Sequence, residues 1–494
     1  MVGPSQLTAR AGSSPAVLRL AAPEVHALQE LVFRRYPYAE WATFGRFGWR
    51  ETPHGLVLSL AALDPPGAGD LDEHVGHVAI AEPYSLRVAL TAETHPLAVG
   101  VIHSHPRDYA PRPSPIDDDM DRYYAGYLDG FTRGRPYVSL ILAKVEDELA
   151  VSGRVFWKGM WVVVDRVVIE RNPVRAWVGG ARPLPRAPSP ERTARFATAF
   201  GDEAVSRLRE STVAVIGAGG TGSAAIEVLA RAGVGRLIIV DPDVLEVSNL
   251  ERIHGSVPGH AANRVPKVAL AGDHVRAIDS YIDVQAYIGS LPQREVLDAV
   301  VTANVLLGCT DQQHSRLAVA DVAIRYLVPS LDCGVLLEGG AGKITGQIAQ
   351  ILRVLPADPC PWCREMVLSQ RVTQELMSET ERARRRLAAD AACARGEEPD
   401  PYWQDQPQLN TVGYHTTMVG AMIAGYAIGW LTGRFDPPFA RLQLNLVAPL
   451  LDVTDVDVSA RRDCVCRRIR GWADQGVADA LITPPSHWPA VRRV

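Results

Sequence analysis

Two histidines and several carboxylates gather within a short stretch of the first third of the chain, VGVIHSHPRDYAPRPSPIDDDMD at residues 99–121. His103 and His105 lie two residues apart at the end of an apolar strand, so both imidazoles are expected on one face. Asp117 follows His105 by twelve residues and can return across a proline-rich loop. Two histidines and one carboxylate leave the fourth zinc position to water, the arrangement of a catalytic zinc site.

Histidines at a strand end are also common core or surface residues, so the pair alone does not establish a metal site. Pro106 and the Ser-x-x-Asp run that begins at Ser114 favour metal. With them, the stretch resembles the JAMM (MPN-type) metallopeptidases, which remove ubiquitin and its relatives from lysine. Their pattern is an upstream Glu, then His-x-His-Pro, then Ser-x-x-Asp, and the resemblance covers about residues 20–160.

The resemblance implies an α/β/α domain with a zinc ion held by His103, His105 and Asp117, and with Ser114 stabilising the oxyanion. It implies Glu40 as the general base, with Glu51 as the alternative. The gap between His105 and Ser114 is one residue longer than in the family, which keeps Asp118 and Asp119 open as alternatives to Asp117.

A second set of residues that could do chemistry begins at the turn VIGAGGTGS, residues 215–223. Glycines in a G-x-G-x-x-G pattern between a strand and a helix let the backbone approach a phosphate at the helix N-terminus. Asp241 ends the next strand, where a carboxylate meets a ribose. Up to this point an NAD dehydrogenase fits as well. Two cations, Arg252 and Lys267, and a further acid, Asp311, instead suit a triphosphate with magnesium.

The runs GAGGTGS, DPDVLEVSNLERI, VPKV and CTDQ resemble the ThiF/MoeB and ubiquitin-activating enzymes over about residues 190–470, with Gln312 where Asn is usual. The resemblance implies a Rossmann-like, doubly wound domain that adenylates the C-terminal glycine of a small β-grasp (ubiquitin-like) carrier with ATP and Mg²⁺. It implies a homodimer in which Arg195 reaches the partner's site. The implied nucleotide-binding residues are Gly217, Gly219, Gly220, Gly222, Asp241, Asn249, Arg252, Lys267 and Asp311.

Cysteines form two close pairs, Cys360-Pro-Trp-Cys363 and Cys464-Val-Cys466. Four thiolates suit a closed tetrahedral zinc site, and the family commonly has two Cys-x-x-Cys pairs in these places, although the second pair here is one residue short. Cys393 lies in a charged insertion at 371–408 where the family places a crossover loop. It is a candidate nucleophile for a thioester with the carrier, with Arg395 nearby to lower its pKa, or else an ordinary cysteine.

The elements that must position these residues follow from periodicity and punctuation. Strands are expected at 55–60, 99–103 and 138–142 in a domain spanning 1–178, and a β–turn–α–β unit at 212–240 opens a parallel sheet in a domain spanning 191–470. The Pro/Gly-rich run at 179–190 predicts a linker, and 471–494 a tail. The apolar run at 412–431 is long enough to span a bilayer, but its His, Thr and Gly residues favour a buried helix.

Composition sets outer limits on function. The 494 residues carry a net charge of −5, which argues against a protein that binds nucleic acid mainly through phosphates. Seven cysteines in so long a chain do not form a disulfide scaffold and, with no signal peptide visible, favour the cytoplasm.

We therefore expect a bifunctional enzyme that matures or releases a ubiquitin-like carrier and activates it. A conjugating enzyme or a sulfur donor would be a further partner. The alternatives are sulfur-carrier activation for biosynthesis and a scaffold with one or both sites inactive.

Overall fold

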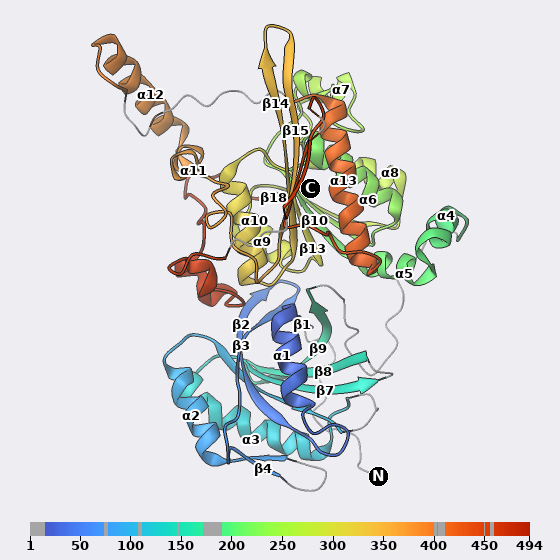
Figure 1. The fold of residues 1–494 in the computed structure, drawn as a ribbon, viewed down its shortest axis with the longest axis vertical. Coiled ribbons are helices and arrows are strands. Elements are labelled where there is room, and N and C mark those ends of the chain that lie inside the picture. The colour runs from blue at the N-terminus through green and yellow to red at the C-terminus, as the bar shows by residue number, and fades with distance from the viewer. Residues whose placement is uncertain are drawn as a thin grey trace. The chain divides into compact units, whose positions relative to one another are not determined.

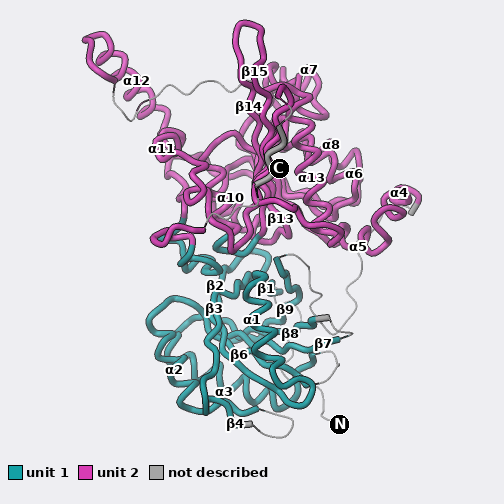
Figure 2. The backbone as a smooth tube through the Cα atoms, in the orientation of Figure 1, with its two compact units in different colours: residues 1–183, 324–328, 467–480 teal, residues 184–323, 329–466, 481–494 magenta. Residues whose placement is uncertain are grey.

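The computed structural model describes residues 15–73, 78–106, 111–145, 148–170, 190–399, 403, 411–448, 450–454 and 459–494. The chain forms two compact units (Figure 2). Unit 1 contains residues 1–183, 324–328 and 467–480, and unit 2 contains 184–323, 329–466 and 481–494. The linker expected at 179–190 lies outside the described residues except for Pro190, and the end of the charged insertion at 371–408 is also only partly described.

Unit 1 is built on a sheet that closes into a barrel in the order β1-β3-β2-β6-β7-β8-β9, where a three-layered α/β/α domain was expected. Apolar residues from all seven strands fill one face of this sheet together with α1, while α2 and α3 pack on the other face. Helices thus still cover both faces, but the sheet is curled, because β1 pairs with both β3 and β9. The elements are β1 (Ala16–Leu20), α1 (Ala22–Val32), β2 (Ala42–Thr52), β3 (Gly55–Asp64), β4 (Leu71–Glu73), β5 (Val78–Ile80), α2 (Glu82–Glu93), β6 (Ala98–Ser104), α3 (Pro115–Thr132), β7 (Tyr137–Val145), β8 (Glu148–Trp157) and β9 (Met160–Ile169).

A segment from the far end of the chain completes unit 1. The Gly48 N–H donates to the Gly471 carbonyl at 3.1 Å, and Arg50 pairs with Asp474 at 2.7 Å. A side chain at Gly48 would meet the backbone of Gly471 and Trp472 within 2.5 Å, so the close approach requires glycine. Residues 467–480, expected to fall at the end of the second domain and in a tail, therefore belong to the packing of unit 1.

Unit 2 is a nine-stranded sheet in the order β17-β16-β15-β14-β13-β10-β11-β12-β18. The five central strands, β14 to β12, are parallel, with the chain leaving β10 in both directions, as in doubly wound nucleotide-binding folds. Helices α6, α8 and α13 cover one face, and α9 and α10 the other (Figure 1). The fold class expected for this part of the chain is therefore present.

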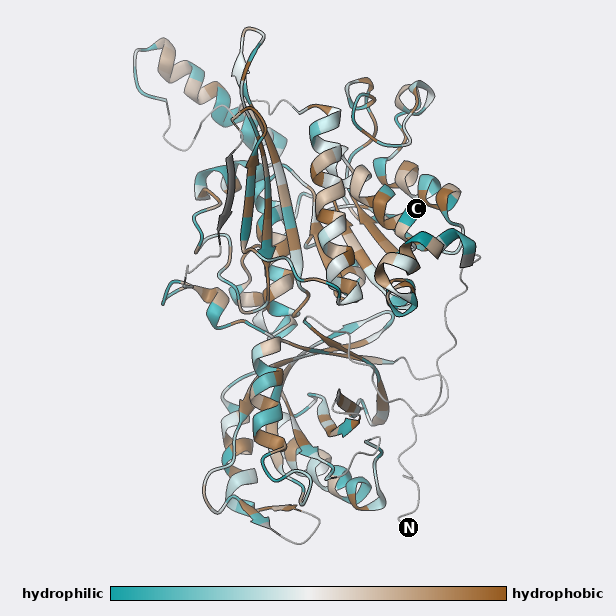
Figure 3. Ribbon diagram, turned by 45° about the vertical axis from the view of Figure 1, so that its right-hand side comes forward, coloured by the Kyte–Doolittle hydropathy of each residue, from teal (hydrophilic) through white to brown (hydrophobic). Residues whose placement is uncertain are grey.

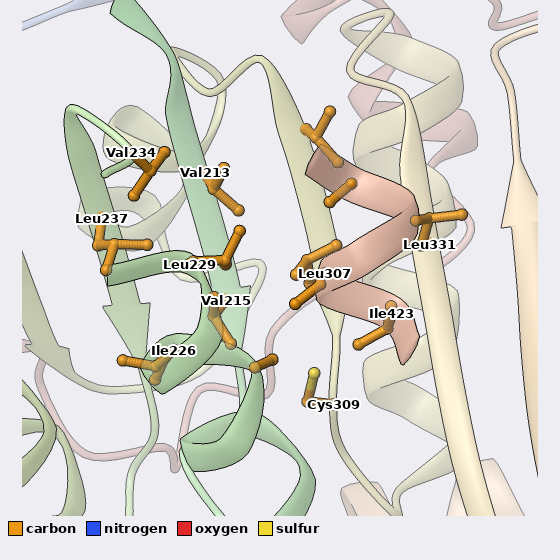
Figure 4. Close-up of a cluster of buried hydrophobic side chains, with 14 of the residues drawn as sticks. Val213, Val215, Ile226, Leu229, Val234, Leu237, Leu307, Cys309, Leu331 and Ile423 are labelled. Atoms are coloured by element: carbon orange, nitrogen blue, oxygen red, sulfur yellow. The ribbon is translucent and has the colours of Figure 1, made fainter. Parts of the chain in front are cut away.

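A continuous apolar core holds the sheet of unit 2 against its covering helices. Figure 4 shows part of that core, in which Val213, Val215 and Leu307 of the sheet meet Ile226 of α6 and Ile423 of α13. Figure 3 shows the hydrophobic, brown segments running through the central strands. Burial on both faces explains why these strands read as uninterrupted apolar runs in the sequence.

The remaining elements of unit 2 follow in chain order. They are α4 (Pro190–Phe200), α5 (Asp202–Glu210), β10 (Thr212–Ile216), α6 (Gly220–Ala232), β11 (Arg236–Val240), η1 (Val247–Asn249), α7 (Pro258–Ala262), α8 (Lys267–Ile278), β12 (Asp283–Ile288), α9 (Arg294–Val300), β13 (Val305–Gly308), α10 (Gln313–Arg325, whose last residues belong to unit 1), β14 (Ser330–Gly340), β15 (Lys343–Val354), α11 (Ser369–Leu376), α12 (Glu379–Ala394), α13 (Gly413–Thr432), β16 (Arg441–Asn445), β17 (Leu450–Thr454), η2 (Val465–Arg467) and β18 (Arg492–Arg493), with η3 (Asp474–Asp479) in unit 1. The apolar run at 412–431 is α13, packed against α6. None of the helices within the described ranges is long and apolar enough to cross a membrane.

Candidate functional sites

The glycine turn connects β10 to α6 at the point where the strand order of the parallel sheet reverses. Gly217 has a φ of +96°, which favours glycine, and a side chain there would come within 2.6 Å of the Cys309 carbonyl. A side chain at Gly222 would come within 1.8 Å of the Gly217 carbonyl. Gly219 is the N-cap of α6 and Gly220 its first residue. The turn therefore leaves the backbone open at a helix N-terminus, which suits an anion.

Asp241 follows β11 and braces this turn. Its Oδ2 accepts a hydrogen bond from the Ala218 N–H at 2.7 Å, and its Oδ1 accepts one from the Asp243 N–H at 2.8 Å. Burial raises the pKa of Asp241, and the neighbouring Lys267 ammonium opposes that effect. The carboxylate thus fixes the loop at this edge of the sheet.

Lys267 is the first residue of α8, and its Nζ lies 2.7 Å from Oδ2 of Asp243. Burial alone would lower the pKa of Lys267, but Asp241, Asp243 and Asp311 raise it above its ordinary value. The side chain is therefore a cation held at the same edge of the sheet as the glycine turn. Asp311 is exposed and follows β13, the strand next to β10.

Arg252 and Asn249 lie between β11 and α7. The Arg252 side chain passes beside Gly220, with its Cδ 3.2 Å from the position of a Cβ there, and its Nη1 donates to the Ser248 carbonyl at 2.7 Å. Asn249 is buried, and its Oδ1 accepts a hydrogen bond from the Glu246 N–H at 3.1 Å. The structure thus brings the predicted glycines, acids, amide and cations to one edge of the sheet.

Two features of this edge were not anticipated from the sequence. Asp243 is the direct partner of Lys267, although only Asp241 of the pair Asp-Pro-Asp was assigned a role. The first turn of α13 also reaches the glycine turn, because Thr416 contacts the position of a Cβ on Gly220 at 2.7 Å. The available signal was a cluster of three polar residues, 415–417, in an otherwise apolar run.

Arg195 and Cys393 lie apart from this edge. Arg195 is exposed on α4, and α4 and α5 lie by the C-terminal end of α13, where Arg434 donates to the Phe200 carbonyl at 2.6 Å (Figure 1). Cys393 is exposed near the end of α12. Arg395, expected to lower the pKa of Cys393, instead pairs with Glu397 at 2.7 Å.

The four paired cysteines form one cluster. Their sulfurs are 3.8 Å apart between Cys360 and Cys363, 3.6 Å between Cys360 and Cys464, and 3.8 Å between Cys363 and Cys466. A tetrahedron of sulfurs around Zn²⁺ has an edge of about 3.8 Å, so the spacing fits the ion. The shorter Cys-x-Cys pair is accommodated by the 3-10 turn η2. Cys309 and Cys333 are buried in the apolar core of unit 2.

His103, His105 and Asp117 converge in unit 1. Nε2 of His103 lies 3.0 Å from Oδ1 of Asp117, and Nε2 of His105 lies 3.6 Å from Oδ2. Despite this proximity, neither ring nitrogen of the buried His103 has a hydrogen-bond partner of acceptable geometry among the described residues. Two ligands of one tetrahedral zinc ion are about 3.3 Å apart, so these residues fit a shared metal better than a hydrogen-bonded pair. Burial raises the pKa of Asp117, but the two imidazoles outweigh it and the pKa falls below its usual range.

The neighbouring carboxylates are occupied elsewhere. Arg154 on β8 pairs with Asp118 and with Asp121, each at 2.6 Å, and Asp119 pairs with Arg122 at the surface at 2.8 Å. One helical turn therefore directs Asp117 to the histidines and Asp118 and Asp121 to a buried guanidinium.

Ser114 and Glu40 flank the histidine cluster. Ser114 caps α3: its Oγ accepts from the Asp117 N–H, and its own N–H donates to Oδ2 of Asp117 at 2.6 Å. Glu40 precedes β2, whose Ala42 pairs with His103, and its charge helps to raise the pKa of His103 against the effect of burial. Glu51 lies at the far end of β2 and pairs with Lys158 at 2.7 Å.

Residues 191–467 match the ThiF family. The chain is 30% identical over 165 residues to the sulfur carrier protein ThiS adenylyltransferase of Bacillus subtilis, covering 33% of this chain and 46% of that protein. It is 34% identical over 168 residues to the adenylyltransferase and sulfurtransferase MOCS3 of Arabidopsis thaliana (32% and 34%), and 33% identical over 165 residues to the SAMP-activating enzyme E1 of Haloferax volcanii (33% and 56%). The matched segments thus span from about a third to just over half of these relatives.

Among solved structures, the complex of Escherichia coli MccB with MccA-N7isoASN is similar with a TM-score of 0.43 and 17% identity, covering 56% of this chain and 74% of that one. None of these comparisons assigns the JAMM-type domain expected in the first third of the chain. The family match covers more than half of the chain and includes the glycine turn, Asp241, Lys267 and Asp311. The chain belongs to the ThiF family.

Proposed function

We propose that the ThiF-family region adenylates the C-terminal glycine of a ubiquitin-like carrier protein. The supporting observation is the convergence of the open glycine turn with Arg252, Lys267 and Asp311 at the switch point of the parallel sheet. A dinucleotide site needs the glycine turn and Asp241 but has no use for two cations and a further acid. A nucleoside triphosphate with magnesium needs all of them.

In this proposal a carboxylate oxygen of the carrier attacks the α-phosphorus of ATP, and the bond to the β-phosphate oxygen breaks to release pyrophosphate. Arg252 and Lys267 neutralise the charge that develops on the phosphates, and Asn249 orients them. Asp241 positions the ribose. Asp311 would hold Mg²⁺, which, when bound, draws the phosphate oxygens together and offsets their charge.

Replacing Asp311 with Ala tests this assignment. ATP–pyrophosphate exchange, measured with a panel of small β-grasp proteins ending in Gly-Gly, should fall to background because the magnesium ligand is gone. Asp273→Ala is the matched control, since Asp273 is exposed and pairs with Arg276 one turn away on the same helix at 2.9 Å. Tight NAD binding by the native chain, with no exchange for any carrier, would favour the dehydrogenase interpretation instead.

A role in sulfur transfer is the main alternative, and the printed names of the relatives from Bacillus and Arabidopsis favour it. Under this alternative the adenylated carrier goes on to a thiocarboxylate with sulfur from a separate donor. A conjugation pathway would instead pass the carrier to a thiol such as Cys393, and then to a conjugating enzyme. Cys393→Ala separates the two, because it should abolish a thioester seen on non-reducing gels but leave pyrophosphate exchange unchanged.

Arg195 is proposed to act in the site of a second copy of the chain, since it lies on α4 and away from the glycine turn of its own. Arg195→Ala and Asp311→Ala should each be inactive alone. When the two variants are mixed and allowed to exchange subunits, about a quarter of native activity should return, because one site in each mixed dimer is complete. No recovery, with mixed dimers demonstrated by mass spectrometry, would place Arg195 outside the reaction.

Unit 1 is proposed to be a zinc metallopeptidase acting on the same carrier. His103, His105 and Asp117 would hold the ion, which, when bound, lowers the pKa of a coordinated water towards neutrality. Glu40 would take the proton from that water, and the Ser114 hydroxyl would donate to the oxyanion. His103→Ala with His105→Ala should remove one equivalent of zinc from the full chain, whereas Glu40→Ala should retain zinc and lose cleavage. Undiminished zinc in the double variant would refute the assignment.

The peptidase and the adenylating region are proposed to act in sequence. Only a free C-terminal carboxylate can be adenylated, so a carrier made with extra residues after its glycines must first be trimmed. An extended precursor given ATP should be adenylated by the native chain and not by Glu40→Ala. If both adenylate it equally well, removal of finished conjugates is the better account of unit 1.

A further inference from the structure

The first turn of α13 carries the polar residues Tyr414, His415, Thr416 and Thr417 on a helix that is otherwise apolar. Three of them have identified neighbours. The Tyr414 hydroxyl bonds with Gln347 of β15, Thr416 contacts the position of a Cβ on Gly220, and Thr417 Oγ1 lies 3.0 Å from Nε2 of His254. The turn is thus fixed between the β14–β15 hairpin on one side and the glycine turn on the other.

His415 lies between these two contacts. Successive residues on a helix are about 100° apart, so the side chain of His415 points between that of Tyr414, directed at the hairpin, and that of Thr416, directed at the glycine turn. It is 0% exposed, and neither ring nitrogen has a hydrogen-bond partner among the described residues. A buried imidazole without a partner is unfavourable, so its presence requires a reason other than stability.

The region around His415 also has a positive electrostatic potential, which favours a negatively charged ligand. Gly220 lies against Thr416, and Gly420, one turn further along α13, lies against Thr221 and Ala224 of α6, so the two helices run side by side in the same direction. Both helices therefore begin at the same edge of the sheet, and the positive ends of both helix dipoles lie there. The hydroxyl of Thr310, beside the glycine turn, is likewise buried and has no hydrogen-bond partner within the part of the chain that the structure describes.

The order of the strands separates this place from the nucleotide. Asp241 follows β11 and Lys267 lies close to it, on one side of the glycine turn. Helix α13 covers β13, β14 and β15 on the other side. A nucleotide reaching from the glycine turn to Asp241 would therefore not occupy the side of the turn where His415 lies, and the group that attacks the phosphate would approach from that side. Strand β14 continues for eight residues, about 26 Å, beyond its pairing with the end of β13, which gives an extended peptide a strand to follow.

We propose that His415 is a substrate-contacting residue, whose ring nitrogen donates a hydrogen bond to the C-terminal tail of the carrier where that tail passes from the β14–β15 hairpin to the glycine turn. The ligand is an extended peptide end with small side chains and a free carboxylate. The assignment rests on the proposed adenylation and adds the residue that holds the acceptor substrate in it.

The test uses the full chain saturated with a non-hydrolysable ATP analogue and titrates it calorimetrically with a synthetic octapeptide ending in Gly-Gly. The native chain should bind the peptide acid more tightly than its C-terminal amide. His415→Leu should weaken binding of the acid by about tenfold or more, as expected for loss of a hydrogen bond to a charged or strongly polar acceptor. His415→Asn and His415→Gln place an amide near Nδ1 and Nε2 respectively, so rescue by one of them identifies the donor nitrogen.

Two further measurements separate this role from a structural one. His415→Leu should keep its affinity for the ATP analogue and melt at the same or a higher temperature, because an apolar side chain replaces an unpartnered imidazole. Thr417→Val, on the same turn but directed at His254, should bind the peptide within about twofold of the native chain.

Three results would overturn the inference: equal peptide affinity in the native chain and His415→Leu, no detectable peptide binding by the native chain, or loss of nucleotide binding in the variant. If whole carriers still support pyrophosphate exchange in any of these cases, the proposed function stands and only the role of His415 falls. If no carrier supports exchange, the adenylation proposal itself fails.

Discussion

The contact between α13 and the helix that follows the glycine turn predicts opposite effects for two glycines on the same helix. A Cβ at Gly420 would lie 2.4 Å from the Thr221 carbonyl and 2.7 Å from the Ala224 Cβ. A Cβ at Gly425 would have no atom within 4 Å. Gly420→Ala and Gly425→Ala therefore make the same chemical change, at a tight and at an open position of one α-helix.

The magnitudes follow from these distances. Gly425→Ala removes backbone freedom from the unfolded chain at no steric cost, which should raise the free energy of unfolding by about 0.5 to 1 kcal/mol. Gly420→Ala must displace backbone rather than a flexible side chain, and overpacking of this kind costs about 1 to 3 kcal/mol. The two variants should thus differ by about 1.5 to 4 kcal/mol. For a region of this size each kcal/mol corresponds to about 2 to 4 °C in melting temperature.

The assay is thermal unfolding of the full chain followed by circular dichroism, together with the KM for ATP in pyrophosphate exchange. Because Thr221 belongs to the first turn of α6, Gly420→Ala should also raise the KM for ATP several-fold, while Gly425→Ala should leave it unchanged. Equal melting temperatures for the two variants would refute the packing of α13 on α6, and with it the convergence of the two helix N-termini.

Further predictions concern the metal cluster and two buried charges. Cys363→Ser should lower the zinc content of the full chain by one equivalent, measured by atomic absorption. Burial raises the pKa of Asp332 to about 6 from its unperturbed 3.8, so between these pH values the folded state binds a proton that the unfolded state releases. The free energy of unfolding should therefore fall as the pH rises from 4 to 6. Asp332→Asn should remove this part of the pH dependence, measured by urea titrations at several pH values. Arg154→Met removes the guanidinium that pairs with the buried carboxylates of Asp118 and Asp121, and should destabilise unit 1 by about 3 to 5 kcal/mol at pH 7.

Features set by short-range spacing could be predicted from the sequence. The glycine turn is constrained by contacts among Gly217, Gly222 and the adjacent strand, so its pattern specifies its geometry. The β–turn–α–β unit predicted at 212–240 is formed by β10, α6 and β11, and the apolar run at 412–431 is a helix packed inside unit 2. Period-two and period-3.6 patterns report such elements directly because neighbouring residues share a strand face or a helix face.

The tertiary structure decided what depends on residues far apart in the chain. Asp117, Asp118 and Asp119 are equivalent in the sequence, and Arg154, reaching in from another strand, determines which of them remains for the histidines. The segment 467–480 joins unit 1 because its backbone fits against Gly48, a contact that no local pattern encodes. The role proposed for His415 also depends on the tertiary structure. In the sequence it is one polar residue that argues against a membrane span, and only the packing of α13 beside α6 brings it, buried and without a partner, to the edge where the glycine turn ends.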